Sequence, residues 1–245
     1  MRVLAAPAKL TWSLEVLARR ADGYHELRAE MVTLALADEL RVDEAGDYVR
    51  LRGPYATAVV PGPGELVGRA LALVGRHAGV EVDKRIPVGG GLGGGSADAG
   101  AILRWAGGVD DAAALTLGSD VPFCQRGGRA RVEGIGERVT PLPWVDRAVT
   151  LLIPSFAVST AACYRAHDEL VAQGWRPAGP NHLEDPARRV EPRLGVTMDW
   201  LRERYGEVRL AGSGSTLFFE GIGDDGAVLA GPAGDVRVVV TATAR

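Results

Sequence analysis

The sequence predicts a two-domain protein of mixed α and β structure, divided into residues 1–145 and residues 146–245. Two observations support this prediction. A strand pattern, a glycine-rich loop and a helix pattern follow one another between residues 80 and 105. Beyond Trp144, a new apolar strand at 149–153 opens a second series, in which helix patterns cover 161–173 and 197–205.

The glycine loop is the clearest functional signal in the chain. Six of the seven residues from 89 to 95 are glycine. Residues 80–86 before it alternate as in a strand, with Lys84 on the apolar side, and residues 97–105 after it favour a helix with Ser96 as its N-cap. A loop in this position directs backbone N–H groups and the positive end of the helix dipole at one point. We therefore expect a phosphate-binding loop here rather than a flexible linker.

Two other phosphate loops fit this pattern less well. A Walker A loop requires Gly-Lys-Ser/Thr, which is absent after the glycines. Gly89, Gly91 and Gly94 satisfy the dinucleotide pattern, and Asp110 stands about 20 residues on, where that fold places a ribose-binding acid. Residues 106–119, however, lack the β-branched run of a second strand, which argues against a Rossmann oxidoreductase.

Composition excludes several classes of protein. The chain has 245 residues, 47% of them hydrophobic, with a net charge of −3, so we expect a real core and no nucleic-acid partner. No apolar run approaches a membrane span and no signal-peptide pattern opens the chain, so the expectation is a cytoplasmic protein without membrane contact. Cys124 and Cys163 lie far apart, which predicts reduced, buried thiols. The four histidines show no metal-ligand spacing and are interpreted as surface or structural residues.

The N-terminal half contains further elements. Residues 10–16 alternate as a half-buried strand after Pro7, which puts Lys9 and Thr11 on the face opposite Trp12. A turn follows at 19–23, then strand material at 30–37 and 40–42, and a helix at 65–78.

A short helix at 111–117 leads into the segment 118–122, and residues 129–139 predict a hairpin around Gly134–Gly136. In the C-terminal half, the proline-rich segment 174–192 is interpreted as a loop-rich connection. A second glycine loop, 211–215, stands between strand-like residues 208–210 and 216–219.

Five separated motifs occur in the order of a known family: Pro7–Leu10, Asp22–His25, Pro87–Asp98, Leu117–Pro122 and Gly212–Gly214. Through them the chain resembles the 4-diphosphocytidyl-2-C-methyl-D-erythritol kinases of the GHMP kinase superfamily, over nearly its whole length. The resemblance implies an N-terminal domain like ribosomal protein S5 domain 2, a ferredoxin-like C-terminal domain, and an active site in the cleft between them.

The resemblance also implies an activity: transfer of the γ-phosphoryl group of ATP to the 2-hydroxyl of 4-diphosphocytidyl-2-C-methyl-D-erythritol, in the non-mevalonate route to isoprenoid precursors. By the same resemblance Asp120 is the catalytic base and Lys9 its partner. An alcohol is a poor nucleophile, so a carboxylate in reach of its proton helps, and a nearby ammonium favours the ionised carboxylate. Mg²⁺ is the implied metal cofactor, bridging the ATP phosphates.

The implied ligand-binding residues form two sets. The nucleotide set is Pro87, Val88, Gly89, Gly90, Gly91, Leu92, Gly93, Gly94, Gly95, Ser96 and Ala97, with Ser96 also implied as the Mg²⁺ ligand. In the substrate set, Tyr24 and Tyr164 match positions that sandwich cytosine, His25 matches the position that hydrogen-bonds its edge, and Thr11 and Thr160 contact the same molecule.

Three residues depart from the family pattern: Thr11 and Glu65 each replace Asn, and Ala97 replaces Ser, which affects expected nucleotide contacts. Two alternatives remain. One is another GHMP small-molecule kinase, of homoserine or mevalonate type. The other is a non-catalytic nucleotide-binding relative, which has no need for both Lys9 and Asp120. The expected assembly is a monomer or homodimer.

Overall fold

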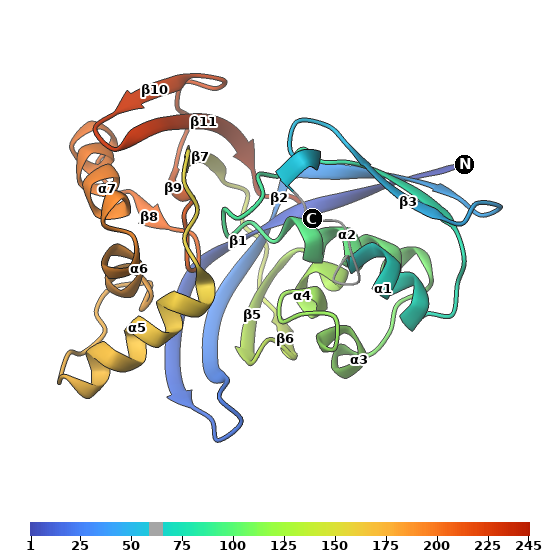
Figure 1. Ribbon diagram of the computed structural model, residues 1–245, viewed down its shortest axis with the longest axis horizontal. Coiled ribbons are helices and arrows are strands. Elements are labelled where there is room, and N and C mark those ends of the chain that lie inside the picture. Colours follow the sequence, from blue (N-terminus) through green and yellow to red (C-terminus); the bar gives the residue numbers. More distant parts are fainter. Residues whose placement is uncertain (59–65) are drawn as a thin grey trace.

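The computed structural model describes residues 1–58 and 66–245, and it contains two sheets, each with its own helices (Figure 1). The elements of the first sheet's half are β1 (Arg2–Arg19), β2 (His25–Asp43), β3 (Tyr48–Arg52), the 3-10 turn η1 (Ala56–Ala58), α1 (Leu66–Leu73), β4 (Gly79–Asp83), α2 (Gly94–Trp105), α3 (Asp111–Leu115), α4 (Val121–Arg126), β5 (Arg129–Gly134) and β6 (Arg138–Pro141). Those of the second are β7 (Ala148–Pro154), α5 (Thr160–Ala172), α6 (Glu184–Val190), α7 (Pro192–Tyr205), β8 (Arg209–Leu210), β9 (Leu217–Glu220), β10 (Val228–Gly231) and β11 (Gly234–Ala242).

Strand β2 organises the first sheet. It pairs with β1 along its whole length, from Arg2 opposite Val42 to Arg19 opposite His25, and this hairpin extends beyond the other strands at its turn end (Figure 1). On its other edge β2 pairs with β5 over residues 27–32 and with β4 over residues 39–43. Residues 33–38 lie between these two ladders, where Leu34 forms a bridge with Thr243 and Asp38 accepts from the backbone N–H groups of Arg85 and Ile86.

The second sheet has the order β10-β11-β7-β9-β8 and is antiparallel throughout. It shares a hydrophobic core with the first sheet, because Val149 and Leu151 of β7 and Phe218 of β9 belong to the same buried cluster as Leu10 and Leu34. Full burial of each such side chain contributes about 1.5–3 kcal/mol. The two halves are therefore joined by packing, and the division at residue 145 stays a prediction.

The first strand is longer and more deeply buried than its alternation indicated. Strand β1 starts at Arg2 and contains Pro7. Residues 9–12 are all buried, so the prediction of a half-buried strand is wrong there, but it is confirmed over residues 13–16, where Ser13 and Glu15 are partly exposed. Helix α2 contacts β1, while the ring of Trp12 packs against Phe218 at 5.2 Å. Alternation of polar and apolar residues cannot show that the polar face is also covered.

The N-terminus of α2 also differs from the prediction. The helix begins at Gly94, with Gly93 as N-cap in a left-handed conformation and no side-chain cap, so Ser96 is not the cap but lies in the first turn. A glycine with positive φ makes the turn into the helix, and no side-chain cap accepts from the first N–H groups of α2.

Two short helices lie where loops were expected. Helix α4 begins directly after Asp120, and α6 lies inside the segment 174–192, which corrects its interpretation as a loop-rich connection. Helix α1 ends at Leu73, earlier than predicted, and Gly75 follows with a φ of 64°. The hairpin at 129–139 is confirmed.

Both cysteines are free and buried, as expected, and burial raises the pKa of Cys163 to about 11. Among the described residues, no helix has the length and apolar character of a membrane span.

Candidate active site

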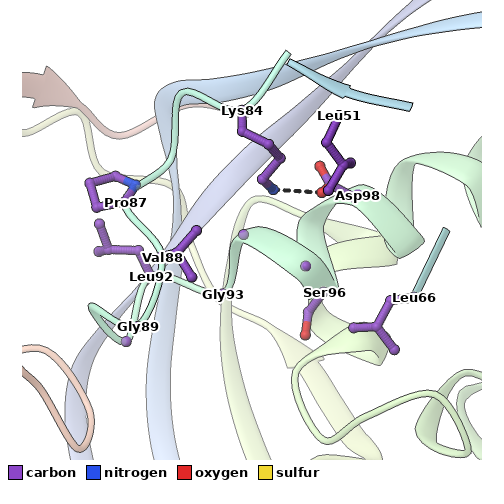
Figure 2. A pocket seen from close by; sticks show the side chains of 13 residues that line it. Leu51, Leu66, Lys84, Pro87, Val88, Gly89, Leu92, Gly93, Ser96 and Asp98 are labelled. Carbon is purple, nitrogen blue, oxygen red and sulfur yellow. Dashed lines mark hydrogen bonds and ion pairs between the residues drawn. The ribbon is translucent and has the colours of Figure 1, made fainter. Parts of the chain in front are cut away.

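A cavity of about 360 Å³ opens beside the glycine loop and the start of α2 (Figure 2). Leu51 and Leu66 supply apolar walls, and Lys84 and Asp98 also line the cavity. The first N–H groups of a helix have no partner inside the helix, so the start of α2 offers donors and a positive dipole end to an anion. The cavity combines an apolar wall for a flat ring with donors for phosphate oxygens.

The glycine loop is held in place from two sides. The backbone N–H of Lys9 donates to the carbonyl of Leu92 at 3.0 Å, and that of Thr216 donates to the carbonyl of Gly90 at 3.2 Å. Gly91 has a φ of 77°, and a Cβ there would lie 2.7 Å from the carbonyl oxygen of Ala211. Only glycine permits this approach between the two glycine loops.

Asn181 organises the second glycine loop. Its side-chain nitrogen donates to the carbonyls of Leu210 and Gly212, at 2.9 and 2.8 Å, and its side-chain oxygen accepts from the N–H of Leu183. All three bonds are buried, which makes this asparagine a fixed clamp between β1 and the loop. The prediction from sequence missed Asn181, because a single Asn after a proline reads as a turn residue.

Lys9 and Asp120 meet beside the glycine loop. Nζ of Lys9 lies 3.2 Å from Oδ2 of Asp120 and donates to Oγ1 of Thr11 at 3.0 Å. Lys9 is only 6% exposed, whereas 29% of the Asp120 side chain is accessible. Asp120 occupies the N-cap position of α4 without making a side-chain cap bond, so its carboxylate remains available to a ligand. A Cβ on Gly93 would lie 2.8 Å from Cγ of Lys9, so this pair adjoins the first cavity.

A second cavity, of about 460 Å³, contains the aromatic residues predicted to bind substrate. Tyr24, His25, Thr160 and Tyr164 all line it, together with Ser119. The rings of His25 and Tyr164 stack at 4.8 Å, and Tyr24 is 57% exposed. Burial raises the pKa of the Tyr164 hydroxyl, and the nearby charge of Asp120 adds to the shift. Asp120 therefore lies within electrostatic reach of the second cavity while its partner Lys9 adjoins the first.

The predicted site residues are divided among these places. Of the nucleotide set, the residues that line the first cavity are Pro87, Val88, Gly89, Gly91, Leu92, Gly93, Gly94, Gly95 and Ser96. Gly90 faces Thr216 instead, and Ala97 is fully buried inside α2. Thr11 is buried, and its Oγ1 accepts from Nζ of Lys9. The hydroxyl groups of Thr160 and Ser213 form a hydrogen bond of 2.7 Å. Glu65 lies outside the described residues.

A buried charge cluster behind the glycine loop was not predicted. Lys84 donates to the carboxylate of Asp38. It also donates to Oδ2 of Asp98 at 2.6 Å (Figure 2). Asp38 also accepts from the backbone N–H groups of Arg85 and Ile86, in the gap between the two ladders of β2. The sequence carried one signal of this cluster, since a lysine on the apolar side of a strand pattern needs buried partners.

Burial and charge act in opposite directions on this cluster. Burial alone would lower the pKa of Lys84, but the two carboxylates outweigh it and the pKa is raised. Burial raises the pKa of Asp98, and the attraction of Lys84 opposes the shift. Oδ1 of Asp98 has no hydrogen-bond partner among the described residues. The cluster joins the sheet to α2, and with it the start of the helix that borders the cavity.

Replacing Lys84 by Met is expected to lower the free energy of unfolding by about 3–5 kcal/mol, because two buried carboxylates lose their cation. Urea unfolding followed by circular dichroism measures the change. Arg85→Met is the matched control, since Arg85 pairs with Asp83 and Glu39 at the surface and its loss leaves no buried charge. Equal stability of the two variants would contradict the structural role of Lys84.

Comparison with known proteins agrees with this geometry. Residues 65–128 match the family described as GHMP kinases N terminal domain. The chain is 36% identical over 235 residues to the 4-diphosphocytidyl-2-C-methyl-D-erythritol kinase of Paracoccus denitrificans, covering 87% of this chain and 85% of that protein. The enzyme of that name from Thermus thermophilus is 37% identical over 240 residues, with 87% and 85% covered.

Solved structures show the same relationship. A crystal structure of 4-(cytidine 5'-diphospho)-2C-methyl-D-erythritol kinase matches with a TM-score of 0.73 and 33% identity, covering 100% of both chains. A mevalonate kinase structure matches with a TM-score of 0.60 at 12% identity, which shows a shared fold alone. The GHMP kinase fold expected from the motifs is confirmed, and with relatives this similar over most of its length, the chain belongs to the 4-diphosphocytidyl-2-C-methyl-D-erythritol kinase family.

Proposed function

We propose that this chain uses ATP to phosphorylate the 2-hydroxyl of 4-diphosphocytidyl-2-C-methyl-D-erythritol, as a step in the non-mevalonate synthesis of isoprenoid precursors. The observation that carries the proposal is the Lys9–Asp120 contact, because Lys9 lies against Gly93 of the phosphate-type cavity and Asp120 follows Ser119 of the aromatic cavity. Family membership supports the kinase activity, and the two cavities supply separate places for a nucleotide and a cytidine substrate.

In the proposed mechanism Asp120 takes the proton of the attacking hydroxyl. The substrate oxygen forms the new bond to the γ-phosphorus, the bond from that phosphorus to the β–γ bridging oxygen breaks, and ADP leaves. Nζ of Lys9 lies 3.2 Å from Oδ2 of Asp120, so its positive charge stands beside the group where negative charge develops. The backbone N–H groups at the start of α2 orient the phosphates.

The residues present fit the proposed Mg²⁺. Ser96 lies in the first turn of α2 and lines the cavity, and the carboxylate of Asp120 is accessible, so hard oxygen donors are at hand. Bound Mg²⁺ would neutralise charge on the phosphates. Ser96 is the proposed protein ligand.

A coupled ADP-release assay tests the proposed substrate. Purified protein is given ATP with 4-diphosphocytidyl-2-C-methyl-D-erythritol, its decytidylated analogue, homoserine or mevalonate. Turnover is expected with the cytidine compound alone. Turnover of homoserine or mevalonate instead would favour another GHMP kinase, and no turnover with any of them would favour a non-catalytic relative. The Lys9–Asp120 pair argues against the latter, because binding alone does not need a base.

Tyr24→Ala or Tyr164→Ala is expected to raise KM for the cytidine substrate roughly 10- to 100-fold, because stacking on a base is worth ~1–3 kcal/mol. KM for ATP should barely change, since the two cavities are distinct. Phe at either position keeps the ring and should retain most of the affinity, which makes it the matched control. Normal KM for the cytidine substrate in both Ala variants would contradict this assignment of the base pocket.

A further inference from the structure

Three side chains with metal-binding chemistry meet below the aromatic cavity. Nε2 of His25 lies 2.7 Å from Oδ1 of Asp168, and Nδ1 of His167 lies 3.5 Å from the same oxygen. One ligand atom from each residue lies within 4.8 Å of the others. His25 starts β2, whereas His167 and Asp168 belong to α5, so residues 142 positions or more apart in sequence form one cluster.

His167 is the unexplained member of the cluster. It is 6% exposed, and within the described part of the chain neither ring nitrogen has a hydrogen-bond partner. The ring packs edge-on against His25 and against Trp175, at 6.1 and 5.9 Å between centroids. Buried polar atoms are normally paired, so two unpaired imidazole nitrogens beside a carboxylate indicate a missing partner.

Burial and neighbouring charges both act on this cluster. Burial lowers the pKa of His167 and outweighs the opposing effect of Asp168. Burial pushes the pKa of Asp168 upward, but the hydrogen bond from His25 and the charge of Arg19 outweigh it and the net shift is downward. Arg19 contacts Oδ2, the other carboxylate oxygen, at 3.4 Å, and 63% of its side chain is exposed, which weakens its competition with a cation.

We propose that His25, His167 and Asp168 form a Zn²⁺ site. Two imidazole nitrogens and one carboxylate oxygen are ligands that Zn²⁺ accepts readily, whereas Mg²⁺ prefers oxygen alone. Coordination requires Zn–N distances of about 2.0–2.1 Å, so we expect the two rings to rotate when the ion binds. Three protein ligands leave one coordination position for water.

Zn²⁺ at this site changes what His25 offers to a ligand. Without metal, Nε2 of His25 donates to the carboxylate of Asp168, because an ionised carboxylate can only accept. The other ring nitrogen of the neutral His25, Nδ1, then has a free lone pair. With Zn²⁺ on Nε2, that proton is released to water and Nδ1 takes one up, so the ring stays neutral and Nδ1 becomes a donor. This consequence rests on the proposed function. When Nδ1 of His25 is a donor, it can no longer accept from the amino group of a bound base, so such a base would bind less well.

Isothermal titration with Zn²⁺, without nucleotide, tests the site directly. One Zn²⁺ per chain is expected, with affinity reduced at least about tenfold in His167→Phe. Phe keeps the ring between His25 and Trp175 but removes both nitrogens, and thermal unfolding verifies that the variant is folded. His77→Phe, at an exposed histidine, is the matched control and should bind as the parent does. Co²⁺ in place of Zn²⁺ should give the visible bands of a tetrahedral ion in the parent and lose them in His167→Phe.

Unchanged Zn²⁺ affinity in His167→Phe, or no binding by the parent protein, would overturn the proposed site. A kinetic measurement separates this result from a failure of the proposed function. Zn²⁺ should raise KM for the cytidine substrate in the parent but not in His167→Phe, with KM for ATP unchanged in both. If Zn²⁺ binds through His167 and KM for the cytidine substrate stays the same, the site stands and the proposed contact of His25 with the base is wrong.

Discussion

Replacing Asp120 by Asn is expected to lower kcat by roughly 100-fold or more while ATP binding is retained. The amide keeps the shape of the side chain but loses the charge that accepts the hydroxyl proton, and it also loses the attraction of Nζ of Lys9, 3.2 Å away. Steady-state ADP release measures kcat, and calorimetry with ATP verifies that the nucleotide still binds.

Asp110→Asn is the matched control for this experiment. Asp110 caps α3 by accepting from the backbone N–H of Ala113, a role that Asn also performs well. Its kcat should equal that of the parent protein. Near-normal turnover by Asp120→Asn would contradict the assignment of a base, and positioning and charge would then account for the whole rate enhancement.

Replacing Gly93 by Val is expected to abolish ATP binding in a protein that still folds. Gly93 has a φ of 69°, where a β-branched residue is strained, and its Cβ would lie 2.8 Å from Cγ of Lys9. The added side chain would therefore displace both the start of α2 and Lys9. Calorimetry with ATP measures the loss, and circular dichroism tests the fold.

Gly75→Val separates backbone strain from the loss of the phosphate site. Gly75 has nearly the same φ, 64°, but no atom within 4 Å of the Cβ position. This variant should lose a similar amount of stability and still bind ATP. If Gly93→Val retained the affinity of the parent protein for ATP, the phosphates would have to bind elsewhere.

Local signals were sufficient for much of this protein. The glycine run, the alternation before it and the hairpin glycines at 134 and 136 act on neighbouring residues, because turn conformation and strand or helix period depend on nearby sequence. The helix boundaries were predicted less accurately: Gly93, in a left-handed conformation, is the N-cap of α2, where Ser96 was expected. The short helix α4 was missed, since six residues give too few turns for a periodic pattern.

By itself, the sequence determined that the chain has a phosphate-type loop before a helix, separate motifs in the order of one kinase family, and two buried thiols. The resemblance already implied Lys9 as the partner of Asp120. Only the tertiary structure decided which other distant side chains meet: Lys84 with Asp38 and Asp98, and His25 with His167 and Asp168. The physical reason is that charges and hydrogen bonds act over a few ångströms in space, whatever the separation along the chain. The packing of α5 against the β1–β2 hairpin, which no local pattern specifies, brings the histidine cluster together.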